Sequence, residues 1–169
     1  CANTSFVQVE IFLLNLTGEY IQCLDTYLKN EKMENRVESI FSFIDKVLKQ
    51  IRDSKDTKKL SSFKEEVLQR IVQLSQLSIP EVVNLCHQWY DSDNMLIIDK
   101  LQDNLELQLQ YIEAILDSYK EEDFSEKNKE TEIYLSLLTK HIDLLCKLEK
   151  IEEILPNLKK RPSYPVETC

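Results

Sequence analysis

The chain has 169 residues, of which 43% are hydrophobic and 30% are charged, and its formal net charge is −9 at pH 7. This length and balance predict a folded protein with a sizeable core and argue against disorder. The acidic charge argues against nucleic acid as a partner, because phosphate contacts need clustered Lys and Arg. No run of about 18 apolar residues occurs, so we expect no direct membrane insertion. A single Gly favours helices over sheets that turn at Gly.

The first predicted helix covers residues 6–16 and is so densely apolar that we expect it to be well buried. The only Gly follows it at Gly18, which is typical of a helix end with a left-handed residue. A second helix is predicted over residues 19–29. Because the connection is so short, the two helices should form an antiparallel hairpin.

Apolar residues spaced by three and four predict a longer helix over residues 33–51. Its inward stripe comprises Val37, Ile40, Phe41, Ile44, Val47, Leu48 and Ile51. A charged loop should follow over 53–59, and then one helix over 60–77. Ser78 as N-cap and Pro80 in the first turn predict the next helix, over 80–90.

Four more helices are predicted over 94–101, 105–119, 131–147 and 149–158, with a charged loop over 120–128. About nine short helices with short links, and no alternating strand, predict an all-α fold. We expect an α-solenoid of short antiparallel helix pairs, with residues 1–169 as a single segment. The last residues, 163–169, resemble the start of a further helix, so we interpret the chain as part of a longer one.

The sequence offers little material for catalysis or for binding a metal ion. Its five cysteines are odd in number and widely spaced, so we expect free and mostly buried thiols: Cys1, Cys23, Cys86, Cys146 and Cys169. His87 and His141 form no metal-ligand spacing with them, and no residue pattern supplies an oxyanion hole or an orienting third group. We therefore expect no catalytic, cofactor-binding or metal-binding residues and no cofactor.

Trp89 and Tyr90 are the candidate protein-contact residues, because adjacent aromatic side chains can anchor an interface. The alternative for both rings is packing in the core.

Three segments resemble a known family of repeats. Residues 18–28 are similar to the helix-turn-helix of clathrin-heavy-chain-type repeats, in which a Gly turn precedes a small residue, a Leu and an aromatic. Residues 105–116 and 134–146, the latter followed by 154–158, resemble the repeats of endosomal and vacuolar tethering subunits. The chain is thus similar to the clathrin-repeat subunits of the CORVET tethering complex, and subunits of the sister HOPS complex or of lysosome-related organelle biogenesis complexes share these motifs.

The resemblance implies a scaffold segment of a membrane-tethering complex, in the cytoplasm and peripheral on endosomal membranes. Its implied partners are other tethering-complex subunits and an early-endosomal Rab GTPase, the latter reached indirectly or through other regions. An alternative from another class is a secreted four-helix cytokine-like ligand. The chain length, the terminal cysteines and the glycosylation sequence at Asn15–Thr17 fit that alternative.

Overall fold

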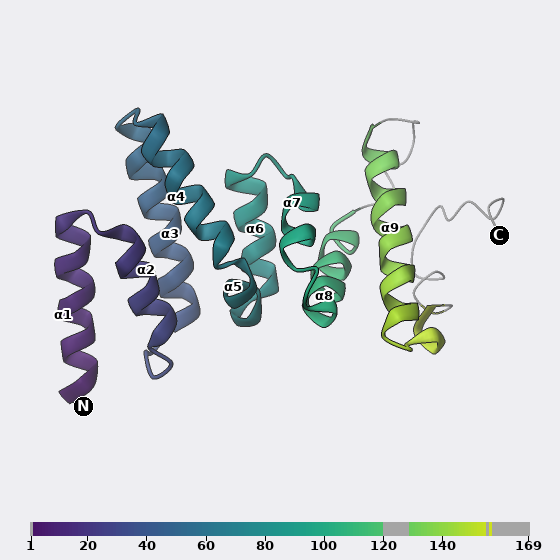
Figure 1. The fold of residues 1–169 in the computed structure, drawn as a ribbon, viewed down its shortest axis with the longest axis horizontal. Helices are drawn as coiled ribbons and strands as arrows, with labels where there is room; N and C mark the ends of the chain where they lie inside the picture. Colours follow the sequence, from purple (N-terminus) through teal and green to yellow (C-terminus); the bar gives the residue numbers. More distant parts are fainter. Residues whose placement is uncertain (1, 120–128, 155, 157–169) are drawn as a thin grey trace. The chain divides into compact units, whose positions relative to one another are not determined.

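The computed structural model describes residues 2–119, 129–154 and 156. These residues contain nine α-helices and no strand, so the prediction of an all-α fold is confirmed (Figure 1). The chain divides into two compact units, Cys1–Lys100 and Leu101–Cys169. None of the described helices combines the length and apolar character needed to cross a membrane.

Seven helices make up the first unit. They are α1 (Ala2–Thr17), α2 (Tyr20–Lys29), α3 (Arg36–Asp53), α4 (Thr57–Gln69), α5 (Ile71–Leu77), α6 (Ile79–Trp89) and α7 (Asn94–Lys100). Neighbours along the chain pack side by side, and α3 also contacts α6. The direction of the chain alternates from α1 to α4 (Figure 1).

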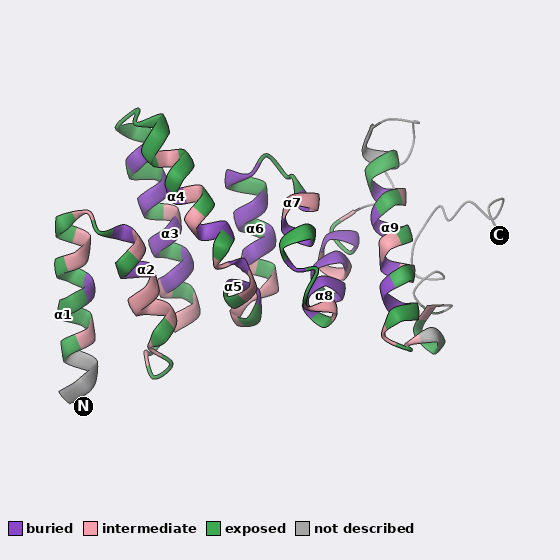
Figure 2. Cartoon of the chain, viewed as in Figure 1, coloured by how far each residue is buried: buried purple, intermediate pink, exposed green. Residues whose placement is uncertain are grey.

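The hairpin of α1 and α2 forms as predicted, with Gly18 at φ +77° between them. The Gly18 N–H donates to the Asn15 carbonyl at 3.3 Å and closes the end of α1. Ile11 turns inward, where the Cys23 thiol donates to its carbonyl at 3.7 Å. The expectation that this first helix is well buried is wrong, because only its α2-facing side is covered and most of its apolar side chains are exposed (Figure 2).

The core of this unit is built around α3, whose inward stripe is buried as predicted except for the half-buried Val37. Phe43, outside the predicted stripe, is buried as well at 6% exposure, since α3 has neighbours on several sides. The single helix predicted over 60–77 is two helices, which meet at Arg70. The loop predicted over 53–59 is shorter, because the Asp56 carboxylate accepts from the Lys59 N–H at 2.9 Å and starts α4 at Thr57.

The second unit contains α8 (Leu105–Leu116), α9 (Lys129–Lys147) and a 3-10 turn, Ile151–Glu153. The α8 and α9 helices pack on each other, and Tyr111 and Tyr134 are buried. A single helix is predicted over 149–158, and within this range the structure contains the 3-10 turn Ile151–Glu153. The predicted loop 120–128 and the partial helix 163–169 lie outside the described residues.

Candidate protein-docking groove

The walls of the candidate site are the helices α3 and α6. A different sequence feature determines each helix: an apolar stripe in α3 and an N-cap in α6. The side of α3 that carries the apolar stripe faces the core. Residues 38, 42 and 45 lie beside this stripe. The α6 helix begins at Ser78, whose hydroxyl accepts from the Glu81 N–H at 3.4 Å, with Pro80 in the first turn. This confirms the predicted N-cap.

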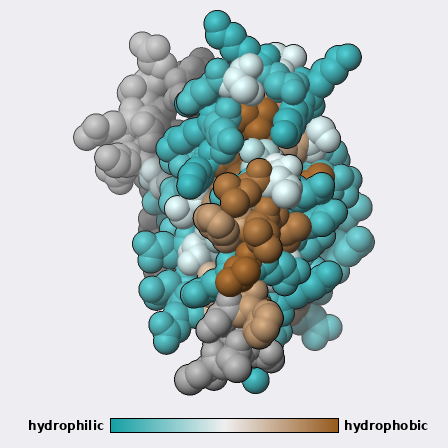
Figure 3. Space-filling view, turned by 90° about the vertical axis from the view of Figure 1, so that its left-hand side faces the viewer, coloured by the Kyte–Doolittle hydropathy of each residue, from teal (hydrophilic) through white to brown (hydrophobic). Residues whose placement is uncertain are grey.

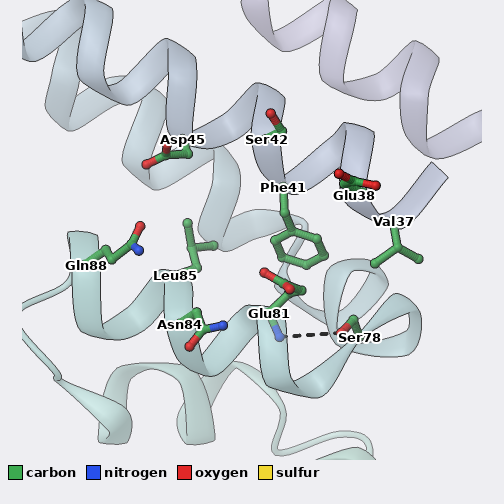
Figure 4. A pocket seen from close by; sticks show the side chains of 10 residues that line it. All are labelled: Val37, Glu38, Phe41, Ser42, Asp45, Ser78, Glu81, Asn84, Leu85 and Gln88. Atoms are coloured by element: carbon green, nitrogen blue, oxygen red, sulfur yellow. Dashed lines mark hydrogen bonds between the residues drawn. The ribbon is translucent and has the colours of Figure 1, made fainter. Parts of the chain in front are cut away.

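A groove of about 480 Å³ lies between these two helices (Figure 4). Its lining comprises Val37, Glu38, Phe41, Ser42 and Asp45 from α3, and Ser78, Glu81, Asn84, Leu85 and Gln88 from the α6 side. Phe41 from α3 and Leu85 from α6 both point into the space between the two helices and form the apolar floor of the groove (Figure 4). Both are buried, at 7% and 5% exposure, so the floor is fixed by the core beneath it.

The rim of the groove is acidic. Asp45 accepts from the Trp89 indole N–H at 3.2 Å and pairs with the Lys49 ammonium at 2.6 Å, so its charge is compensated. Neither Glu38 nor Glu81 forms an ion pair with another described residue. The lining contains no Lys or Arg. The groove therefore combines an apolar floor with two uncompensated carboxylates, a combination that suits a cationic, partly apolar ligand.

Trp89 and Tyr90 lie in the core, at 8% and 5% exposure. The Tyr90 hydroxyl donates to the Lys64 carbonyl at 2.8 Å, and burial raises its pKa well above the usual value. Arg52 covers the Trp89 ring at 5.2 Å, and Lys64 covers that of Tyr90 at 4.8 Å. Neither ring is presented at the surface. Trp89 nevertheless takes part in the site, because its N–H holds Asp45 at the rim.

The two histidines have separate partners. His87 is exposed, and its Nδ1 lies 2.9 Å from the Ser92 hydroxyl, whereas the preceding Cys86 is fully buried. His141 is buried at 1% exposure, with its Nε2 3.1 Å from the Glu113 carboxylate. In the described part of the chain no three His, Cys, Asp or Glu side chains gather to hold a metal ion. Cys23 and Cys86 are buried thiols without a disulfide, and Cys146 is an exposed one.

Sequence reasoning did not single out Glu38 and Glu81. Each stands beside an apolar stripe and resembles any solvated carboxylate on a helix. Their significance depends on α3 lying against α6, a contact between elements about 40 residues apart in the chain.

Comparisons of the chain with family models, with curated proteins and with solved structures find no match.

Proposed function

We propose that the chain is a non-enzymatic, protein-binding scaffold segment of the α-solenoid type, and that the groove between α3 and α6 is its docking surface. The observation that carries the proposal is the pairing of a buried apolar floor, Phe41 and Leu85, with the carboxylates of Glu38 and Glu81. Helical scaffolds commonly bind partners in grooves between adjacent helices.

The ligand that this groove fits is an amphipathic helix with basic flanks. Apolar side chains of such a helix would cover Phe41 and Leu85, and Lys or Arg beside them would approach Glu38 and Glu81. The net charge of −9 acts in the same direction, because it attracts basic partners from a distance. Charge complementarity of this kind contributes mainly to the rate of association and to orientation.

We further propose that this scaffold belongs to an endosomal tethering complex, with other subunits of that complex as partners. The support is the resemblance of residues 18–28, 105–116 and 134–146 to clathrin-type repeats, above all to those of the vacuolar protein sorting 8 subunit of CORVET. Residues 18–28 include the Gly turn and most of α2, and the other two segments lie in α8 and α9. The cytoplasmic face of endosomal membranes is the location that this role requires.

The alternative, a secreted four-helix ligand, rests on chain length, terminal cysteines and Asn15–Thr17. Such bundles are built from four long helices with one or two long crossovers. The described residues instead contain nine helices, most of them joined by short links. We therefore keep the scaffold as the proposed function.

A synthetic peptide tests the groove directly. The probe is a fluorescent helix with Leu at every third or fourth position and Lys on both flanks, titrated with the chain and followed by anisotropy. We expect saturable binding that weakens as salt is raised. Changing Glu38→Gln together with Glu81→Gln should weaken binding about tenfold, because both uncompensated carboxylates are lost.

The matched control changes the same number of charges on the other unit. Glu132 and Glu152 are exposed and lie in α9 and the 3-10 turn. Glu132→Gln with Glu152→Gln should leave the affinity within about twofold, because the net charge alone acts weakly at physiological salt. Equal losses in both double variants would show nonspecific attraction and would contradict the groove as the docking surface.

A cellular capture experiment tests the complex. The tagged chain is isolated from cell extract, and its partners are identified by mass spectrometry. Tethering-complex subunits should be enriched with the native chain and with the Glu132/Glu152 control, and lost with the Glu38/Glu81 variant. Enrichment that contains no tethering subunit contradicts this assignment but leaves the peptide-binding result standing.

A further inference from the structure

The outward side of α1 carries a stripe of exposed apolar side chains, which we call the α1 stripe. Its members are 54–77% exposed: Phe6, Val9, Phe12, Leu13 and Leu16. In Figure 3, which faces the α1 end of the molecule, a hydrophobic patch is bordered by hydrophilic surface. Large apolar residues gathered in one patch at a helix surface mark an interaction site more often than scattered ones do.

Helix geometry shows how broad the stripe is. At about 100° per residue its five members fall within a sector of roughly 120°, the width of the side that a helix normally turns to a core. Ile11 lies on the opposite side and is buried at 8% exposure, against α2. The α1 helix therefore has two apolar sides, and within the described part of the chain only one of them is covered.

The charge on α1 constrains what can cover the stripe. Of residues 2–17 only Glu10 is charged, in a chain with 30% charged residues. A strongly charged partner would find no counter-charge here, whereas a second α1 would meet almost no repulsion. A membrane surface is a poorer match, because interfacial helices carry Lys and Arg on their polar side and α1 has neither.

The exposed area is sufficient for a pair of chains. The five side chains together expose on the order of 500 Å², judged from typical areas of Phe, Leu and Val side chains. Two stripes facing each other would thus bury about 1,000 Å², the lower bound for a specific interface. Phe6, Val9, Leu13 and Leu16 also alternate at intervals of three and four, the spacing with which paired helices interlock their side chains.

We propose that the α1 stripe is a homotypic interface: a second copy of this chain packs its own α1 stripe against the first and makes a twofold symmetric dimer. Such an interface uses the same residues on both copies, so every substitution in the stripe acts twice. The interface lies on a different helix from the groove between α3 and α6.

Sedimentation equilibrium of the 169-residue chain, in the presence of a reductant, tests the proposal. The reductant keeps disulfides between cysteines from producing a dimer. We expect a reversible dimer at micromolar concentration. Leu13→Glu should raise the dissociation constant at least about 100-fold, because a charge enters the interface from each copy. Gln8→Glu is the matched control, since Gln8 is exposed on α1 outside the stripe, and it should leave the dimer intact.

A second variant separates association from folding. Leu16→Lys introduces the opposite charge near the C-terminal end of α1, where the helix dipole favours it, so the helix itself should keep its stability. We expect a monomer with an unchanged circular dichroism spectrum, whose melting temperature equals that of the native chain diluted below its dissociation constant. A native chain that stays monomeric overturns the proposal. A dimer that survives both Leu13→Glu and Leu16→Lys overturns it as well, because the contact then lies elsewhere.

Discussion

Arg70 forms a bidentate interaction with Asp25, which is 45 positions earlier in the chain. Its Nε lies 2.6 Å from Oδ1, and its Nη2 lies 3.2 Å from Oδ2. The same guanidinium donates to the Glu66 carboxylate at 2.8 Å and to the Glu66 carbonyl at 2.7 Å. The hydrogen bond to Asp25 raises the pKa of Arg70 further, so its charge is constant with pH. One side chain therefore ties α2 to the junction of α4 and α5.

Changing Arg70→Lys should lower the free energy of unfolding by about 1 kcal/mol, and Arg70→Ala by about 2 kcal/mol. Lysine keeps the charge but cannot reach both carboxylates with a planar fork. Arg70 is 16% exposed, so its pairs are only partly screened by solvent. Urea unfolding followed by circular dichroism measures both variants.

The matched control is the exposed pair of Lys147 and Asp143, 2.7 Å apart on one helix. Lys147→Ala should cost no more than about 0.5 kcal/mol, as is usual for solvated pairs of this spacing. If Arg70→Ala lowers the free energy of unfolding by as little, the interactions of Arg70 with Asp25 and Glu66 contribute no more than an ordinary surface ion pair.

The helices of this chain could be predicted from sequence because their signals are local. The stripe of α3 repeats every three to four residues, and the Ser78 cap with Pro80 occupies a single turn. The break at Arg70 could not be predicted, because apolar residues continue through it at helical spacing. Only the contacts of the guanidinium with Asp25 and Glu66 distinguish that position.

Burial of α1 and the presence of the groove depend instead on which elements meet. An apolar pattern shows that burial of one helix side would be favourable, but it does not show that another element packs against that side. On α1, for example, Phe6 is 77% exposed. The groove needs α3 beside α6, and its Asp45–Trp89 hydrogen bond joins residues 44 positions apart. No periodicity in the sequence encodes that proximity.

Ile44→Asp should lower the free energy of unfolding by at least about 3 kcal/mol, because it places a carboxylate in the core without a partner. Ile44 is fully buried, at 0% exposure. Thermal melting of this variant is compared with that of Ser42→Asp, which adds the same charge at an exposed position of the same helix. Ser42→Asp should stay within about 0.5 kcal/mol of the native chain. Similar melting temperatures for the two variants would contradict the assignment of the inward side of α3.

Ser75, which lies within α5, and Ser78, the N-cap of α6, should respond differently to alanine. Among the described residues, the buried Ser75 hydroxyl has no hydrogen-bond partner. Ser75→Ala should therefore leave stability unchanged or raise it by up to about 1 kcal/mol, because an unsatisfied polar group leaves the core. Ser78→Ala should lower it by about 1 kcal/mol, because the N-cap of α6 is lost. Urea unfolding of both variants measures these changes in the free energy of unfolding. A decrease for Ser75→Ala as large as that for Ser78→Ala would mean that the Ser75 hydroxyl has a hydrogen-bond partner in solution.

The buried thiol of Cys23 should make the protein less stable at alkaline pH. Burial raises its pKa from 9.0 to about 11, and the nearby Glu10 carboxylate adds to the shift. Because the folded-state pKa lies above the unfolded value, this stabilisation is complete below about pH 9 and is lost as pH rises toward about 11. The loss should reach about 2 kcal/mol. Unfolding free energies measured across this range should fall less steeply for Cys23→Ala than for the native chain.

Cys146→Ala is the matched control for this pH series, because Cys146 is an exposed thiol. It should reproduce the alkaline decline of the native chain, since removing a solvated group leaves the folded core unchanged. The same contrast should be visible in chemical modification at neutral pH, where a thiol reagent reaches Cys146 at once and Cys23 only after unfolding. An identical decline in the native chain and in Cys23→Ala would show that other groups, such as Tyr27, whose pKa is also raised by burial, determine the alkaline limit.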